Sequence, residues 1–171
     1  MWMLVRADAD ASRLDEAAGV TTLAASPDTA DRGDPWRWSV RLLPPDNGSP
    51  APRPAVDDGA ERRILEGPEG VRLEVVTDPA HVAASAHLHS GGKAVDLVRE
   101  AGSQLVVVPL EGEALISDST GPWRRWLSPG DVFVVEGEEH ESLRLTPAPE
   151  PSHVAVLRLS PRGNDALRWV P

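Results

Sequence analysis

Proline and glycine divide this chain of 171 residues into short runs, and this division limits the folds open to it. The sequence contains 17 prolines and 14 glycines, together about 18% of all residues, against roughly 12% in an average protein. Between these breakers lie short runs rich in β-branched and alternating apolar residues. Many breakers between short β-type runs are typical of a sandwich or a barrel. The sequence therefore predicts an all-β protein.

The apolar run Leu-Val-Val-Val-Pro-Leu at 105–110 is the strongest strand signal, because a continuous run of this length predicts a strand buried on both faces. Over 36–43, alternation puts Trp36 and Trp38 on one face with Val40, and arginines on the other. The segment 77–93 is polar, and we interpret it as a loop carrying three of the five histidines. Further strands are expected over 1–10, 20–25, 63–75 (a hairpin), 94–99, 114–116, 123–127, 132–135, 142–145 and 153–159.

Charge and composition exclude several classes of function. The net charge is −10, and an acidic chain repels phosphate backbones and anionic lipid, so we expect no nucleic acid and no membrane as partners. There is no cysteine, which excludes disulfides, thiolate nucleophiles and cysteine-bound zinc. The opening apolar stretch is too short for a signal-peptide core, and no apolar run is long enough to span a bilayer. We expect a cytoplasmic protein.

The tripeptide Leu-Glu-Gly occurs twice, at 65–67 and at 110–112, with the two glycines 45 residues apart. Each copy ends an apolar run and begins a hairpin turn, where glycine serves a left-handed or crowded position. The shared context predicts a duplicated β unit. We expect one unit over 1–171, with an N-terminal half over 1–80 and a C-terminal half over 81–171. The alternative is a coincidence between two ordinary hairpins.

The segment 104–140 resembles one half of a cupin, because Pro129-Gly130-Asp131 is followed by a short β run, Gly137 and His140. In active cupins this histidine joins a His-x-His pair and a carboxylate or amide on one metal. His87 and His89 supply such a pair, so the resemblance implies a divalent transition metal held by His87, His89, Gln104 and His140 as an alternative. The pair lies 23 residues before Gly112, which is out of register. We therefore expect solvated histidines and no metal cofactor.

Several segments together resemble the HutD/Ves family of bicupin-like proteins. They are the opening 1–8, the segment 19–27, Trp-Arg-Trp-Ser at 36–39, the run 61–67 and the segment 94–98. The resemblance implies two cupin-like β-sandwich or jelly-roll halves packed as a bicupin. It also implies a cytoplasmic protein with a small-ligand or regulatory role linked to histidine utilisation. At 14–18 the chain has Leu-Asp-Glu-Ala-Ala where the family has Trp-Lys-Asn-Gly-Gly.

If the family's pocket persists, one strand face offers Arg37, Ser39 and Arg41, with Thr21 and Arg62 from neighbouring strands. Arginine binds carboxylates through two parallel hydrogen bonds, which favours a small carboxylate as ligand. The alternative is that these arginines cover a solvent face.

The chain has no complete catalytic motif, so we expect a non-enzymatic small-ligand binder or regulator. A metal-dependent cupin enzyme is one alternative. A β-sandwich interaction protein that forms a homodimer is the other.

Overall fold

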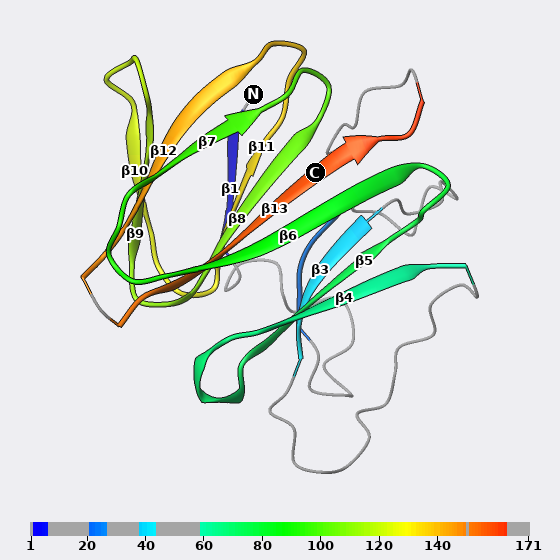
Figure 1. Cartoon of the computed structure of the whole chain (residues 1–171), viewed down its shortest axis with the longest axis horizontal. Coiled ribbons are helices and arrows are strands. Elements are labelled where there is room, and N and C mark those ends of the chain that lie inside the picture. The colour runs from blue at the N-terminus through cyan, green and yellow to red at the C-terminus, as the bar shows by residue number, and fades with distance from the viewer. Residues whose placement is uncertain (1, 7–20, 27–37, 44–58, 150, 164–171) are drawn as a thin grey trace.

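The computed structural model describes residues 2–6, 21–26, 38–43, 59–149 and 151–163 (Figure 1). These residues form thirteen strands and one short 3₁₀ turn, η4 (Pro68–Gly70), and contain no α-helix. No helix in these ranges is long and apolar enough to cross a membrane. The strands are β1 (Trp2–Arg6), β2 (Thr21–Ser26), β3 (Trp38–Leu43), β4 (Glu61–Glu66), β5 (Arg72–Thr77), β6 (Val82–Ser90), β7 (Val95–Arg99), β8 (Gln104–Glu111), β9 (Ala114–Asp118), β10 (Arg124–Leu127), β11 (Asp131–Val135), β12 (Glu141–Pro147) and β13 (His153–Pro161).

Three sheets stack on one another. The central sheet has the order β1-β11-β8-β13-β6, and all its pairs are antiparallel. A four-stranded sheet of order β2-β3-β5-β4, here called the N-sheet, covers one of its faces. A second four-stranded sheet of order β10-β9-β12-β7, here called the C-sheet, covers the other. The central sheet and the C-sheet together make a β-sandwich, as predicted from the sequence.

The central sheet is buried on both faces, which explains the continuous apolar run of β8. Val106 and Val108 point into the core shared with the N-sheet, whereas Leu105 and Val107 point into the core shared with the C-sheet. Residues that alternate along a strand lie on opposite faces, so both sets must be apolar when both faces are covered. Each such side chain contributes about 1.5–3 kcal/mol on burial.

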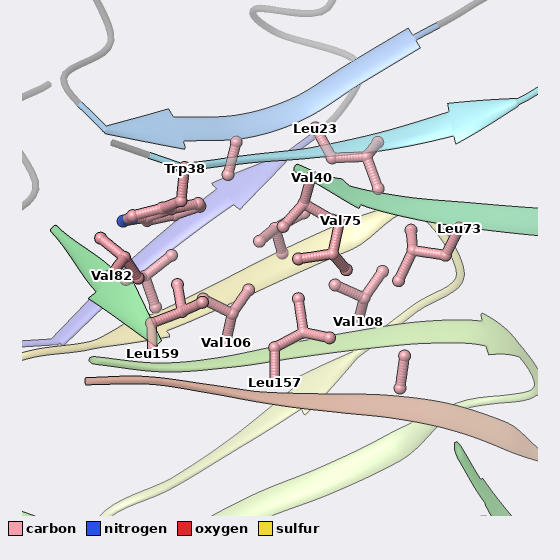
Figure 2. Close-up of a cluster of buried hydrophobic side chains, with 14 residues drawn as sticks. Leu23, Trp38, Val40, Leu73, Val75, Val82, Val106, Val108, Leu157 and Leu159 are labelled. Atoms are coloured by element: carbon pink, nitrogen blue, oxygen red, sulfur yellow. The ribbon is translucent and has the colours of Figure 1, made fainter. Parts of the chain in front are cut away.

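Two hydrophobic cores result. The first, between the N-sheet and the central sheet, contains Trp38 and Val40 of β3, Leu73 and Val75 of β5, and residues of β8, β11 and β13 (Figure 2). The predicted apolar face of β3 is thus confirmed for Trp38 and Val40, both fully buried, whereas Trp36 lies outside the described residues. The second core fills the sandwich and consists of Leu97, Leu105, Val107, Ala114, Ile116, Leu127, Phe133, Val135, Leu143, Leu145, Val154 and Val156.

The prediction of a loop over 77–93 is wrong, because 82–90 form the nine-residue strand β6. Its full length pairs with β13 at the edge of the central sheet. Val82, Ala84, Ala86 and Leu88 alternate along it and lie on the first core. Alanine has low β propensity, so the sequence signal of this strand is weak.

The two Leu-Glu-Gly copies meet in space. A side-chain carbon on Gly67 would lie 3.0 Å from Cδ1 of Leu110, which belongs to the second copy. Gly67 is therefore at a crowded position, although its φ of −90° is open to any residue. Gly112 is both crowded and left-handed, with φ of 68° and the Pro151 carbonyl oxygen 2.5 Å from the added carbon. The division of the chain at 80/81 stays a prediction.

Candidate functional site

The outer face of the N-sheet, opposite the first core, carries a group of polar side chains. Register pairs Arg41 of β3 with Glu74 of β5, and both Ser39 of β3 and Arg62 of β4 with Val76 of β5. Directly opposed residues of antiparallel strands point to the same face. Ser39, Arg41, Arg62 and Glu74 therefore share this face, and we call them the polar cluster.

The polar cluster is shielded from water. Ser39 is 3% exposed and Glu74 4%, and Val76 between them is fully buried. The Arg41 side chain is 17% exposed, and that of Arg62 is 30% exposed. The alternative that these arginines cover a solvent face is therefore wrong for Arg41. Exposure increases toward the edge strand β4, where Ile64, opposite Glu74, is 51% exposed.

Ion pairs in the cluster are incomplete. Arg62 Nη1 donates a hydrogen bond to Glu74 Oε1 at 3.3 Å. Arg41 Nη1 lies 3.9 Å from Glu74 Oε2, which is an ion pair too long for a hydrogen bond. Within the described ranges, four buried atoms of the cluster have no hydrogen-bond partner: Ser39 Oγ, Arg41 Nε, Arg41 Nη1 and Glu74 Oε2.

Such atoms are costly, because a buried polar group without a partner loses its bonds to water and gains nothing in return. Native proteins satisfy the large majority of buried polar atoms. Two guanidinium groups face one carboxylate here, and Arg62 makes the hydrogen bond to it, so Glu74 compensates the charge of Arg41 less well. The arrangement can accept an anionic group that supplies hydrogen-bond acceptors to Arg41.

The other predicted binding residues are placed as follows. Thr21 begins β2 and pairs with Leu42, while Thr22 is the residue directly opposite Arg41. Arg37 lies outside the described residues. Sequence reasoning missed Glu74, the carboxylate at the centre of the cluster. A glutamate between Leu73 and Val75, in a strand neighbouring two arginine-bearing strands, is the signal that could have identified it.

The residues of the alternative metal site do not converge. His87 and His89 pair with Val156 and Val154 and so lie on the side of the second core. Burial, then His87 and Arg158, lowers the pKa of His89 below its usual value of 6.5. His140, by contrast, forms an exposed ion pair with Glu100, with Nδ1 3.1 Å from Oε2.

Gln104 is fully buried and links the sheets instead. Its Oε1 accepts a hydrogen bond from Trp38 Nε1 at 2.7 Å, and its Nε2 donates one to Glu136 Oε2 at 3.0 Å. Among the described residues, no three His, Asp or Glu side chains are grouped so as to hold a metal ion.

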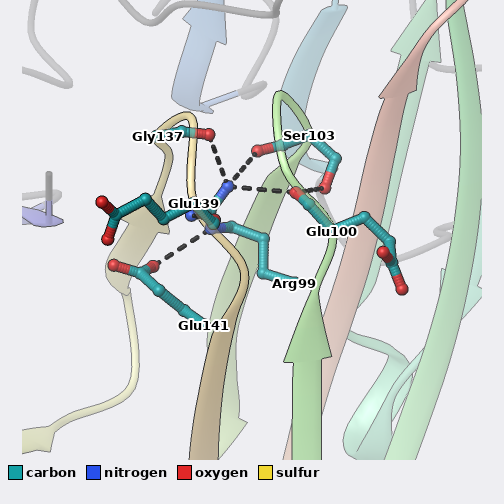
Figure 3. A network of polar contacts seen from close by, with 6 residues as sticks. All are labelled: Arg99, Glu100, Ser103, Gly137, Glu139 and Glu141. Atoms are coloured by element: carbon teal, nitrogen blue, oxygen red, sulfur yellow. Dashed lines mark hydrogen bonds and ion pairs between the residues drawn. The ribbon is translucent and has the colours of Figure 1, made fainter.

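Another arginine, Arg99 at the end of β7, is buried and shows the opposite pattern from Arg41. Its side chain is 1% exposed and is fully engaged in the sandwich (Figure 3). Its Nε donates to Glu141 Oε2 at 3.1 Å. Its two Nη atoms donate to the backbone carbonyls of Glu100, Ser103, Gly137 and Glu139. Arg99 therefore joins the loop after β7 to the loop between β11 and β12.

These features define a class. The chain is an all-β sandwich protein with a further sheet packed on its central sheet. No family model matches the chain, and no curated protein matches it.

Two solved structures have the same fold. A conserved protein of unknown function, PA5104 from Pseudomonas aeruginosa PAO1, aligns over 94% of this chain and 99% of its own, with 17% identity and a TM-score of 0.68. HutD from Pseudomonas fluorescens SBW25 aligns over 95% of this chain and 100% of its own, with 15% identity and a TM-score of 0.60. The chain thus shares the HutD fold over nearly its whole length.

Proposed function

We propose that this chain is a HutD-like, non-enzymatic protein that binds a small carboxylate at the polar cluster. One observation carries the proposal: Arg41 is largely buried, and two of its nitrogens have no hydrogen-bond partner among the described residues. A ligand carboxylate offers two acceptor oxygens to a guanidinium and a charge of the opposite sign. Ser39 Oγ, also buried and without a partner there, supplies a further polar contact.

The electrostatics of the whole chain fit a selective anion site. The net charge of −10 repels anions from the surface in general. The positive charge of Arg41 is partly shielded from solvent, so it attracts an anion more strongly than the charge of an exposed arginine does. Ile64 of the edge strand β4, which pairs with Glu74, is 51% exposed, so solvent reaches this side of the cluster.

The likeness to HutD supports a regulatory role linked to histidine utilisation, carried out in the cytoplasm. This part of the proposal rests on the shared fold and on the sequence resemblance. Acids of histidine degradation are therefore the first ligands to test.

The test is a thermal-shift screen of the purified chain with urocanate, glutamate and formate. A ligand at 100 times its Kd stabilises the folded state by about 2.7 kcal/mol. For a chain of this size, that corresponds to a rise in Tm of roughly 5–11 °C. If no acid raises Tm at millimolar concentration, the proposal is wrong.

The variant Arg41→Met tests whether the ligand-induced rise in Tm comes from the polar cluster. Arg63→Met is its matched control. Arg63 lies on β4, its side chain is 46% exposed, and it forms a surface ion pair with Glu61. We expect Arg41→Met to abolish the ligand-induced shift and Arg63→Met to retain it. Without ligand, Arg41→Met should not lower stability, because two nitrogens of Arg41 have no hydrogen-bond partner among the described residues and Glu74 keeps Arg62.

A further inference from the structure

The two oxygens of Glu74 are in different situations. Oε1 accepts a hydrogen bond from Arg62 Nη1 at 3.3 Å. Oε2 is buried, has no hydrogen-bond partner within the described ranges and lies 3.9 Å from Arg41 Nη1. An ionised carboxylate oxygen is an acceptor only, so Oε2 lacks a donor.

A simple carboxylate cannot supply the missing donor to Glu74 Oε2. It would satisfy Arg41, but its oxygens would lie beside Glu74 Oε2 and repel it, because both groups are negative. A group that donates a hydrogen to Oε2 and an acceptor that faces Arg41 are needed side by side. Both groups must belong to one anionic molecule, since Arg41 is cationic and two of its nitrogens have no hydrogen-bond partner among the described residues.

We infer that the ligand of the polar cluster is an anion that carries an N–H group next to its carboxylate. The carboxylate binds Arg41, and the N–H group donates to Glu74 Oε2. N-acyl amino acids, acidic amino acids and carboxylates on N–H heteroaromatic rings belong to this class. The inference rests on the proposed function and deepens it, because it assigns Glu74 as the residue that determines specificity.

The test compares pairs of probes that differ only in the N–H group. Pyrrole-2-carboxylate is matched with 2-furoate, and N-acetylglycine is matched with N-acetylsarcosine. Both members of each pair carry one negative charge and have similar shapes. A hydrogen bond to a charged acceptor corresponds to roughly tenfold to a hundredfold in affinity. We expect calorimetric titration to give an affinity at least about tenfold higher for the N–H member.

Two variants locate the effect. In Glu74→Gln the acceptor loses its charge, so the preference for the N–H member should fall severalfold while carboxylate binding remains. Glu61→Gln is the matched control, because Glu61 lies on β4 and its side chain is 39% exposed. Ser39→Ala should weaken both members of a pair equally. The wild-type comparison needs no variant and decides the question even if Glu74→Gln folds poorly.

The outcomes separate this inference from the proposed function. Equal affinity within each pair, or binding of formate but of no N–H probe, overturns the inference and leaves carboxylate binding in place. A preference for the N–H member that Glu74→Gln leaves unchanged also overturns it. Failure of every carboxylate to bind overturns both. A preference that is lost in Glu74→Gln and retained in Glu61→Gln supports the inference.

Discussion

Replacing Arg99 with methionine should destabilise the protein strongly, because this side chain joins two loops of the sandwich. Methionine keeps most of the aliphatic volume but removes every donor. Four backbone carbonyls and the Glu141 carboxylate each lose one donor at once, although the carbonyls of Glu100 and Gly137 keep hydrogen bonds from Ser103 and Gly102. Removing one partner of a buried charged network costs about 3–5 kcal/mol. For a chain of this size, this loss corresponds to a fall in Tm of roughly 6–20 °C.

The matched control is Arg144→Met, which removes an arginine from β12. Arg144 is 56% exposed, and its Nη1 lies 3.6 Å from Asp96. Exposed pairs of this kind contribute about 0–1 kcal/mol, so Tm should fall by less than about 4 °C. Thermal unfolding followed by circular dichroism measures both variants. Amide hydrogen exchange should also accelerate over 100–103 and 136–140 in Arg99→Met alone. Equal Tm values for the two variants would refute this reasoning.

Three further changes test other contacts. Gly112→Ala should lower the free energy of unfolding, measured with urea, by more than about 2 kcal/mol, because left-handed strain of about 1–2 kcal/mol adds to a backbone clash at 2.5 Å. Gly70→Ala is the control: Gly70 has a φ of 78° and no atom near the added carbon, so this variant should lose only the strain energy of about 1–2 kcal/mol. NMR titration should give His89 a pKa below 6.5, and Arg158→Met should raise this pKa. Because the folded state binds the proton of His89 less readily than the unfolded state does, the free energy of unfolding should fall as pH decreases below 6.5. A free energy of unfolding that does not change with pH in this range would contradict the prediction. Gln104→Leu should lower stability by about 2–3 kcal/mol, because it leaves a buried indole N–H without an acceptor, and a neutral result would argue against this bridge.

The strands were predictable wherever burial imposes a repeating pattern. In β8 both faces are covered, which requires an unbroken apolar run, and in β3 one face is covered by the first core, which requires alternation. Strand β6 follows the same alternation, but its inward residues include Ala84 and Ala86, which pack against the core without a strong β signal. The sequence pattern was therefore too weak to predict β6, the edge strand of the central sheet.

The candidate site was predictable only in part, because alternation identifies the two faces of a strand but not which of them meets water. Arg41 and Arg62 were candidates for one site only if the family's pocket persists, and in the structure both lie beside Glu74. Glu74 itself has the sequence context of an ordinary solvated position in a half-buried strand. Its burial depends on the tertiary structure around the N-sheet, which no local pattern encodes. For the same reason the spacing of His87 and His89 could not show that Gln104 bonds to Trp38 on the other side of the central sheet.

Arg99 and Arg41 show how one protein can use one arginine for stability and another for binding. Arg99 is 1% exposed and Arg41 17% exposed, so both have lost most of their contact with water. Arg99 replaces its bonds to water by hydrogen bonds to backbone carbonyls and to Glu141. Two nitrogens of Arg41 have no such hydrogen bond to the described residues. A shielded charged group without hydrogen-bond partners lowers the stability of the folded protein, and groups of this kind are typical of binding sites. Arg99→Met should therefore lower Tm both with and without ligand. Arg41→Met should lower Tm relative to the wild type only when a carboxylate ligand is present.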